Sequence, residues 1–405
     1  MSEKIKLLQL SPRFPFPPDD GGKIGIANIL MQFAKQGFEV TFFTFTDGNI
    51  PDEAIRVAQK YCDLILFEHS TENTAMRILS SVLKNESIYI EKHFPQAAEI
   101  RILELARQKD FDAVHADHSC MFPLAKLAAD ERNIPAGLRL HNIEWMIWQR
   151  YADRLPVWHP KRWYVSSQAQ ILRKNEKNFI SQADICFAIT DEDKIRAEEM
   201  AHGANVVVAS AGIEPGNWQP DPDIERDPHQ MILATVYKWQ HNIEALKCLI
   251  SDVLRHLRLE NLDDHVTLLF NDSPDWLQDL HREGIDLKGY VPEVQPYLNQ
   301  AGIYIAPLFV GAGIRIKILE AMAMELPVVA TPVSTEGIHA DEEQGLFVRE
   351  TPADTAAAIV ELMENPDYAR KSGISARKFV LGNFSWERNA GIMADNYRKL
   401  AGSDQ

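Results

Sequence analysis

The residues best suited to chemistry lie in one segment, whose sequence is VGAGIRIKILEAMAMELPVVATPVSTEGI. Gly311 and Gly313 form a turn in which backbone N–H groups can approach a ligand closely. Arg315 and Lys317 follow within the first turn of a predicted helix, where cations oppose the helix dipole unless an anion lies nearby. Glu320 comes one turn later and could accept hydrogen bonds from ribose hydroxyls. This arrangement favours binding of a phosphate and a sugar.

A strand–turn–helix–strand unit must position these side chains. Residues 302–308 are predicted to form a buried strand, 315–324 a helix that Pro327 ends, and 328–331 a second parallel strand. The carboxyl ends of parallel strands are where open α/β sheets bind ligands. A second turn follows at the same edge and adds three candidate ligand-binding residues, Thr335, Glu336 and Gly337. From spacing alone, an ordinary unit with solvated charges fits this pattern equally well.

The start of the chain has the same kind of organisation. Residues 4–10 predict a strand, 24–36 a helix that ends at a glycine, and 40–44 the next strand. Gly21 and Gly22 precede the helix and could admit a phosphate or an acceptor close to backbone amides. On general grounds a glycine turn is more often a tight connection, so both interpretations stay open.

A third candidate group follows the strand predicted at 134–140. His141, Asn142 and Glu144 are polar residues at its carboxyl edge, where His141 could contact a sugar or an acceptor. His115 and His118 lie at the end of an earlier strand without a metal-ligand spacing to any partner. Both are interpreted as ordinary strand-end histidines, with His118 also a weak candidate for a site residue. No metal site is predicted.

The order of the predicted elements indicates two α/β domains in the 405 residues. Residues 1–212 form the first domain, 213–228 a linker rich in Pro, Gly and Asp, and 229–383 the second. The last helix, within 384–405, is expected to pack back on the first domain. Lys238, after the first strand of the second domain, is a possible third cation for the ligand.

Composition narrows the possible partners and compartment. A net charge of −16 argues against a nucleic-acid backbone as the main partner. Four widely separated cysteines without a CxxC pair favour a reduced cytoplasmic protein. We expect neither a signal peptide nor a membrane-spanning helix. Residues 161–180 predict a basic helix, with Trp158 and Trp163 near its start. Such a helix could touch a membrane surface, but a solvated surface helix is the more common interpretation.

The long segment around Glu320 resembles the donor-binding segment of the GT-B glycosyltransferases, specifically the retaining family 4 group. The stretches FPFPPDDGGKIGIANIL and LRLHNIEW also resemble motifs of that family. The resemblance implies that Glu320 holds the nucleotide ribose, that the glycine loop faces the sugar and diphosphate, and that His141 lies beside the donor sugar. Ala312 departs from the family, because many relatives have a second glutamate there. The W-x-x-N turn at 239–242 lacks the basic pair of some relatives, which strengthens the case for Arg315 and Lys317.

The resemblance implies a GT-B fold of two Rossmann-like, doubly wound domains facing a cleft. The expected reaction is metal- and cofactor-independent transfer of a sugar from a nucleotide diphosphate sugar to a sugar, lipid-linked or other hydroxyl acceptor. Its expected setting is synthesis of cell-surface polysaccharide or glycoconjugate in the cytoplasm, with weak peripheral contact to the inner face of the membrane. A GT-B epimerase or phosphorylase, or a catalytically silent sugar-nucleotide binding protein, remains as an alternative. The sequence does not identify the sugar, the base or the acceptor.

Overall fold

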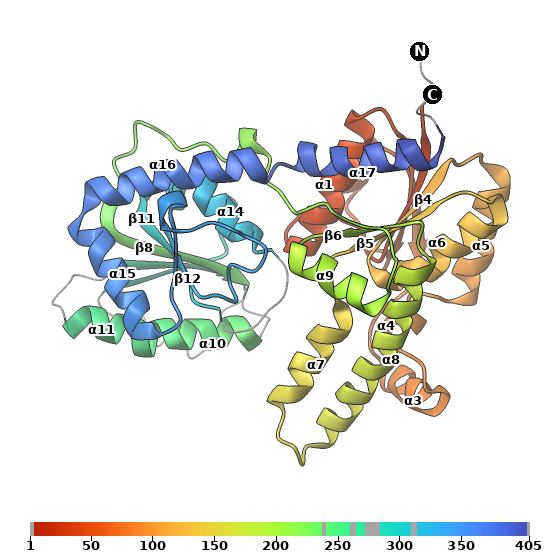
Figure 1. The fold of residues 1–405 in the computed structure, drawn as a ribbon, viewed down its shortest axis with the longest axis horizontal. Helices are drawn as coiled ribbons and strands as arrows, with labels where there is room; N and C mark the ends of the chain where they lie inside the picture. The colour runs from red at the N-terminus through yellow and green to blue at the C-terminus, as the bar shows by residue number, and fades with distance from the viewer. Residues whose placement is uncertain (1–3, 237–239, 260–264, 272–283, 309–313, 403–405) are drawn as a thin grey trace. The chain divides into compact units, whose positions relative to one another are not determined.

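The computed structural model describes residues 4–236, 240–259, 265–271, 284–308 and 314–402. The chain divides into two compact units (Figure 1). The first contains residues up to Ser210 together with Trp386–Gln405, and the second contains Ala211–Ser385. Both units are parallel sheets covered by helices, as the alternation of predicted strands and helices indicated.

The first unit is built on seven parallel strands in the order β3-β2-β1-β4-β5-β6-β7. The strands are β1 (Lys6–Ser11), β2 (Glu39–Thr46), β3 (Asp63–Glu68), β4 (Ala113–Asp117), β5 (Ala136–Leu140), β6 (Ile185–Ala188) and β7 (Val206–Val208). The strand order reverses between β1 and β4, which in open α/β sheets opens a crevice at the carboxyl ends of the strands. Strands β4 and β5 are buried along their whole length, as expected for a sheet covered on both faces.

Helices cover this sheet on both faces (Figure 1). The helices of this unit are α1 (Gly21–Lys35), α2 (Asp52–Ala58), α3 (Ala75–Lys84), α4 (Ile88–Glu91), α5 (Gln96–Gln108), α6 (Phe122–Arg132), α7 (Glu144–Arg154), α8 (Pro160–Gln182), α9 (Asp191–Met200) and α17 (Trp386–Leu400). Helix α1 begins at Gly21 because the Asp20 carboxylate accepts a hydrogen bond from the Lys23 N–H and caps the first turn. The predicted start at Ile24 was therefore three residues late.

The second unit has a described sheet of six parallel strands in the order β10-β9-β8-β11-β12-β13. They are β8 (Asp227–Val236), β9 (His265–Asn271), β10 (Ile285–Gly289), β11 (Ala301–Ala306), β12 (Val328–Ala330) and β13 (Leu346–Val348). The described helices are α10 (Gln240–Cys248), α11 (Leu254–Leu259), α13 (Gln295–Gln300), α14 (Ile316–Ala323), α15 (Pro352–Glu364) and α16 (Pro366–Asn383). The strand order reverses between β8 and β11, so this sheet too has a switch point.

The segment 213–228, predicted as a linker, is packed into the second unit. Ile213 is buried, and its N–H donates to the Phe384 carbonyl at 3.0 Å. The Arg226 guanidinium donates to the carbonyls of Met324 and Glu325 at the end of α14. The segment contains a short 3-10 helix at Pro215–Asn217 and the start of β8, and these hydrogen bonds fix it to the rest of the unit.

Helix α17 belongs to the first unit although it ends the chain. The Tyr397 side chain is buried, and its hydroxyl lies 2.7 Å from Nδ1 of His115 on β4. Gly137 on β5 makes room for that ring, since a Cβ there would lie 2.0 Å from the Tyr397 hydroxyl oxygen. His115 is thus a packing residue. In the described residues, no helix combines the length and the apolar character needed to span a bilayer.

Candidate functional site

A buried polar cluster lies at the carboxyl ends of β4 and β5 in the first unit. Asp117 is fully buried, and its Oδ1 lies 3.0 Å from the Arg139 guanidinium and 3.1 Å from Nε2 of His141. Its Oδ2 accepts a hydrogen bond from the Gln9 side chain at 3.0 Å. The cluster therefore places the predicted site residue His141 at the edge of the sheet, held by groups from three neighbouring strands.

The charges of this cluster fix the protonation of His141. Burial alone would raise the pKa of Asp117, but the Arg139 guanidinium and His141 hold it well below its usual range. Burial, followed by the charge of Arg139, lowers the pKa of His141 to about 4. Nε2 of His141 contacts both the Arg139 guanidinium, which can only donate, and the Asp117 carboxylate, which can only accept. The lowered pKa makes His141 a neutral ring near pH 7.

His118 belongs to the same cluster. Its ring stacks on the His141 ring, with centroids 3.8 Å apart and planes inclined by 12°. Its backbone has φ 86° and ψ 148°, a conformation that costs a non-glycine residue roughly 1–3 kcal/mol. The surrounding contacts maintain this strain: the His118 N–H donates to the Arg139 carbonyl at 3.2 Å.

The first turn of α1 lies against this cluster. A Cβ at Gly25 would fall 2.9 Å from Cε1 of His141 and 3.3 Å from the Arg139 guanidinium. A Cβ at Gly22 would lie 2.2 Å from the guanidinium of Arg13, which forms a two-pronged ion pair with Asp20. Glycine is needed at position 25, because the backbone there approaches the buried His141 and Arg139 side chains closely, whereas the exposed Arg13 side chain could move away from a Cβ at position 22. Gly21 is exposed at the start of the helix.

Glu144 lies at the start of α7, apart from the polar cluster. Its N–H and that of Trp145 donate to the two oxygens of the Glu176 carboxylate, at 3.1 and 2.9 Å. Glu176, on α8, is therefore the cap of α7 and fixes the loop that follows His141. Burial raises the pKa of Glu144 to about 7 and that of Glu176 to about 8. No local pattern predicts this cap, because Glu176 lies thirty-two positions from Glu144.

Among the residues that the structure describes, Asp117, His118 and His141 have possible metal-ligand atoms that lie within 4.8 Å of one another. The group does not suit a metal ion well. The Arg139 guanidinium already bonds both Asp117 and His141, so a fixed positive charge is present where a cation would bind. A second cation would face electrostatic repulsion in a buried environment.

In the second unit, the predicted ligand-binding residues lie around the start of α14. Arg315 occupies the N-cap position of this helix, and Lys317 and Glu320 lie in its first two turns. Glu320 is 8% exposed, and burial raises its pKa while the charge of Lys317 partly offsets that effect. The predicted Gly311, Gly313 and Lys238, together with Ala312, lie outside the described residues.

Hydrogen bonds tie the loop after β11 to the loop after β12. The buried Ser334 hydroxyl donates to the Ala306 carbonyl at 2.5 Å and accepts from the Leu308 N–H at 3.1 Å. Thr331, which sequence reasoning did not select, lies 2.9 Å from Ser334 and donates to the Leu308 carbonyl. These bonds hold the carboxyl ends of both strands in register beside α14.

The turn after β12 then contains the predicted Thr335, Glu336 and Gly337. The Thr335 hydroxyl donates to the Pro332 carbonyl at 3.1 Å, and Gly337 adopts a φ of 79°, which favours glycine. The turn is therefore a defined structure at the same sheet edge as α14.

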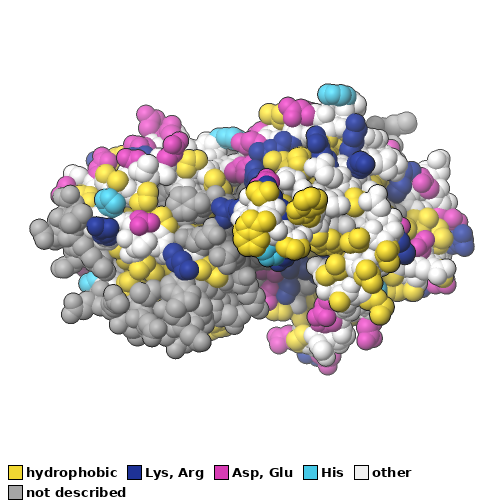
Figure 2. Space-filling model, turned by 90° about the horizontal axis from the view of Figure 1, so that it is seen from below, with side chains coloured by type: hydrophobic (Ala, Val, Ile, Leu, Met, Phe, Trp, Pro, Cys, Tyr) yellow, Lys and Arg dark blue, Asp and Glu magenta, His cyan; other side chains and the backbone are white. Residues whose placement is uncertain are grey.

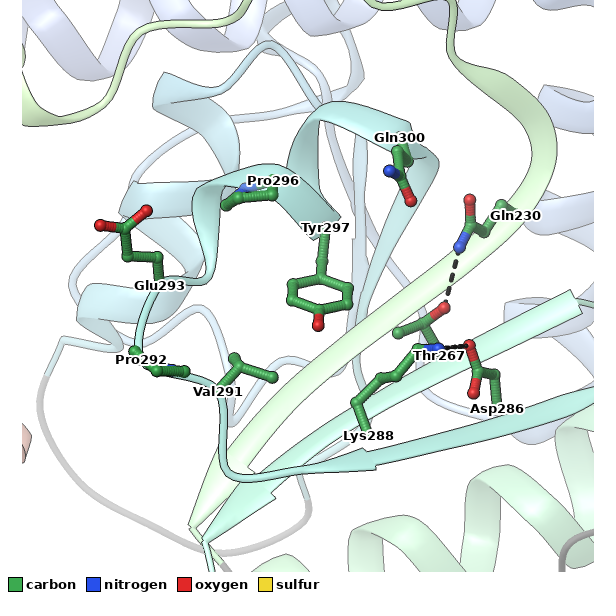
Figure 3. Close-up of a pocket in the computed structure, with 10 residues that line it drawn as sticks. All are labelled: Gln230, Thr267, Asp286, Lys288, Val291, Pro292, Glu293, Pro296, Tyr297 and Gln300. Carbon is green, nitrogen blue, oxygen red and sulfur yellow. Dashed lines mark hydrogen bonds and ion pairs between the residues drawn. The ribbon is translucent and has the colours of Figure 1, made fainter.

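The second unit also has a pocket of about 630 Å³ between α13 and strands β8, β9 and β10 (Figure 3). Four of its polar side chains are paired with one another. Gln230 donates to Thr267 at 2.8 Å, and Lys288 lies 2.7 Å from Asp286. Gln230 and Thr267 lie in the amino-terminal halves of their strands, away from the carboxyl edge that holds Glu320. We assign no ligand to this pocket.

Comparison with known proteins agrees with this arrangement. Residues 230–365 match the family model described as glycosyl transferases group 1, and residues 20–216 match the one described as glycosyltransferase family 4. An uncharacterized 44.6 kDa protein in the cps region of Klebsiella pneumoniae is 19% identical, over 94% of this chain and 96% of that protein.

Two solved structures have the same fold over nearly the whole chain. Sucrose-phosphate synthase from Thermosynechococcus elongatus has a TM-score of 0.75 at 15% identity, covering 99% of this chain and all of the other. Anabaena Alr3699/HepE, in complex with UDP, has a TM-score of 0.69 at 12% identity, covering 98% of this chain and all of the other. Two Rossmann-like units, each matched by a glycosyltransferase family model, together with these shared folds place the chain in the GT-B class of α/β proteins. This chain is a glycosyltransferase of the GT-B fold.

Proposed function

We propose that the protein transfers a sugar from a nucleotide diphosphate sugar to an acceptor hydroxyl, with retention of configuration, as a family 4 enzyme. The observation that carries the proposal is the buried carboxylate of Glu320, one turn after Lys317 on a helix that starts at a strand's carboxyl edge. A carboxylate can accept hydrogen bonds from two ribose hydroxyls. The positive charges of Arg315 and Lys317 and the N–H groups at the start of the helix can bind the negatively charged diphosphate. The UDP bound to the Anabaena protein supports a nucleotide donor.

The reaction that we propose breaks the bond between the sugar C1 and the diphosphate oxygen and forms a bond between C1 and the acceptor oxygen. Negative charge then builds on the diphosphate, where Arg315, Lys317 and nearby backbone amides stabilise it electrostatically. The leaving phosphate oxygen takes the acceptor's proton, so no separate base or nucleophile is assigned. No metal or cofactor enters this scheme.

In the first unit, His141 is proposed to position the sugar or the acceptor. Its neutral state suits this role, because an uncharged ring nitrogen can form a hydrogen bond with a sugar hydroxyl. Gly21 and Gly22 would allow the acceptor to approach the backbone of α1, and Glu144 would limit the site on the α7 side. The acceptor class, a sugar or a lipid-linked hydroxyl of a cell-surface polysaccharide or glycoconjugate, and a cytoplasmic location are part of the same proposal.

A thermal-shift panel with UDP, GDP, ADP, NAD and UDP- or GDP-sugars, with and without Mg²⁺, tests the proposal directly. Binding to the folded state must raise the melting temperature. We expect a rise with one nucleoside diphosphate and its sugars that does not depend on Mg²⁺. A rise with NAD alone would overturn the proposed donor.

The role of the two cations is tested by Arg315→Ala and Lys317→Ala, with Lys378→Ala on the exposed face of α16 as the matched control. Each site variant is expected to lower kcat by about tenfold to a hundredfold, as one lost charge-assisted hydrogen bond would do. Full turnover of Arg315→Ala at saturating donor would show that Arg315 does not stabilise the diphosphate.

A further inference from the structure

A carboxylate without a cationic partner lies buried behind the loop that follows His141. Glu176 on α8 is 0% exposed, and no Lys, Arg or His among the described residues forms an ion pair with it. Taking a carboxylate out of water is costly unless other groups bind its charge, and such carboxylates are concentrated at functional sites. The burial of Glu176 therefore calls for a functional explanation.

Two backbone N–H groups bind this charge. The N–H of Glu144 donates to one carboxylate oxygen of Glu176 at 3.1 Å, and the N–H of Trp145 donates to the other at 2.9 Å. Both N–H groups lie in the first turn of α7, where no carbonyl of the helix can accept from them. A side chain that binds through both oxygens fixes the orientation of the helix start as well as its position.

The pairing of α7 with α8 brings Glu176 to this place. The two helices lie side by side (Figure 1), and the last two turns of α8 meet the start of α7. The outer end of the pair has hydrophobic side chains at its surface (Figure 2). The neighbouring α3 likewise exposes Met76 and Leu83, at 82% and 77%. Glu176 lies at the opposite end of the pair, where α7 begins directly after the loop 141–143.

Buried carboxylates hold this loop on both sides. Before it, Asp117 lies 3.1 Å from Nε2 of His141. After it, Glu176 binds the N–H groups of Glu144 and Trp145. Only two residues separate His141 from Glu144, so a shift of the start of α7 moves the backbone of His141. Glu176 therefore acts on His141 through the backbone.

The groups around Glu176 decide when it is charged. Burial raises its pKa to about 8, the N–H of Trp145 opposes that rise, and the charge of Glu144 adds to it. The other titratable groups that interact with these two carboxyls come from three packed elements: Tyr89 on α4, Cys120 after β4 and Asp193 on α9. None of these groups is a cation, so the carboxylate form of Glu176 becomes dominant only near pH 8.

We propose that Glu176 is a positioning residue for sugar transfer, whose charged form holds the loop 141–145 in the arrangement that His141 needs to contact the substrate. Protonation would turn one acceptor oxygen into an O–H donor, which cannot bind an N–H. One of the two N–H groups would then lose its partner, and the start of α7 would no longer be fixed. Transfer should therefore increase as Glu176 ionises. The inference rests on the role proposed for His141, but the hold on the loop can be measured without a substrate.

Hydrogen exchange of the full chain tests the hold on the loop. Glu176→Gln copies the protonated acid, because the carboxamide has the same shape and a single acceptor oxygen. At about pH 9, the amides of Glu144 and Trp145 should exchange roughly tenfold to a hundredfold faster in this variant than in the wild type, after correction for intrinsic rates. Between about pH 6 and about pH 9, their protection should rise in the wild type and stay low in the variant. Glu176→Asp keeps the charge and should retain part of that rise.

Kinetics with the UDP- or GDP-sugar that stabilises the wild type in the thermal-shift panel test the role in transfer. The kcat of the wild type should rise as the pH passes about 8. The kcat of Glu176→Gln should stay at the low-pH level, roughly tenfold or more below the wild type at about pH 9. The KM for the nucleotide sugar should not change, because the proposed donor residues lie in the second unit. A general loss of structure would instead lower activity at every pH and raise this KM.

Glu104→Gln on α5 is the matched control, because Glu104 is an exposed glutamate of the same unit that pairs with Arg101 at 3.3 Å. It should match the wild type in exchange and kinetics, and circular dichroism should show that every variant is folded. Wild-type protection of the Glu144 and Trp145 amides in Glu176→Gln would overturn the hold on the loop. A wild-type rise of kcat with pH in that variant would overturn the role in transfer. A wild type that turns over none of the nucleotide sugars would refute the proposed function and this role together, whereas lost protection would still assign Glu176 to the loop.

Discussion

Replacing Asp117 by Asn probes the buried cluster that holds His141. The change keeps the shape of the side chain and removes its charge. Asp117 and Arg139 are 0% and 1% exposed, so the guanidinium would be left buried without its counter-charge. Breaking a buried ion pair in this way costs roughly 3–5 kcal/mol. For a unit of this size, each kcal/mol lowers the melting temperature by about 2–4 °C, which gives a fall of about 6–20 °C.

Urea titration measures the free energy of unfolding of each variant, and thermal unfolding measures its melting temperature. The double variant Asp117→Asn/Arg139→Met removes both charges and should be more stable than Asp117→Asn alone, because no unpaired charge stays buried. The pKa of Asp117 is held below its usual range, so this stabilisation is present above about pH 4 and is lost as the pH falls.

A loss below about 1 kcal/mol for Asp117→Asn, with no recovery in the double variant, would refute this reasoning. It would mean that water or another group compensates Arg139, and the neutral state of His141 would then need another explanation.

Three further predictions test other parts of the molecule. Glu320→Gln should weaken binding of the nucleoside diphosphate by about tenfold to a hundredfold in calorimetry, since hydrogen bonds to a charged group are worth about 1.5–3 kcal/mol; unchanged affinity would remove Glu320 from the site. Gly137→Ala should displace Tyr397, lower stability by roughly 1–3 kcal/mol and speed proteolysis within 386–400, whereas wild-type protease resistance would contradict the close packing of α17. Burial lowers the pKa of His93 to about 3, so its neutral ring contributes stability above about pH 6.5 that is lost as the pH falls. The unfolding free energy of His93→Gln should therefore fall less steeply than that of the wild type below pH 6.5, and equal slopes would show that His93 does not titrate on unfolding.

Much of the fold could be predicted from the sequence, because strands and helices of a doubly wound sheet have local signatures. Strands buried on both faces are continuous apolar runs, and proline and glycine mark where elements end. The unit from β11 to β12 could be outlined in this way, with Glu320 placed near a sheet edge. Helix α16 was not predicted, and the hydrogen bonds of the segment 213–228 could not be, because its composition does not reveal its partners.

The candidate site of the first unit could be predicted only in part. His141 follows a recognisable strand, but no local pattern in the sequence singles out Arg139 or Asp117 as its partners. Nothing local shows that β4 and β5 are neighbours or that Gly25 lies against His141. The strained backbone of His118 is likewise visible only once both strands are in place.

The sequence by itself determined the types and approximate bounds of most elements, because hydrophobic periodicity and turn residues act over a few positions. It also placed Arg315, Lys317 and Glu320 at the start of a helix that follows a strand. The tertiary structure decided which side chains meet and which face of each helix is left exposed. Sheet order brings residues more than a hundred positions apart, such as Gln9 and Asp117, into hydrogen-bond contact. Likewise, the amphipathic character of α3 can be read from its residues, but its exposed apolar face follows from the contact of Ser81 with α8.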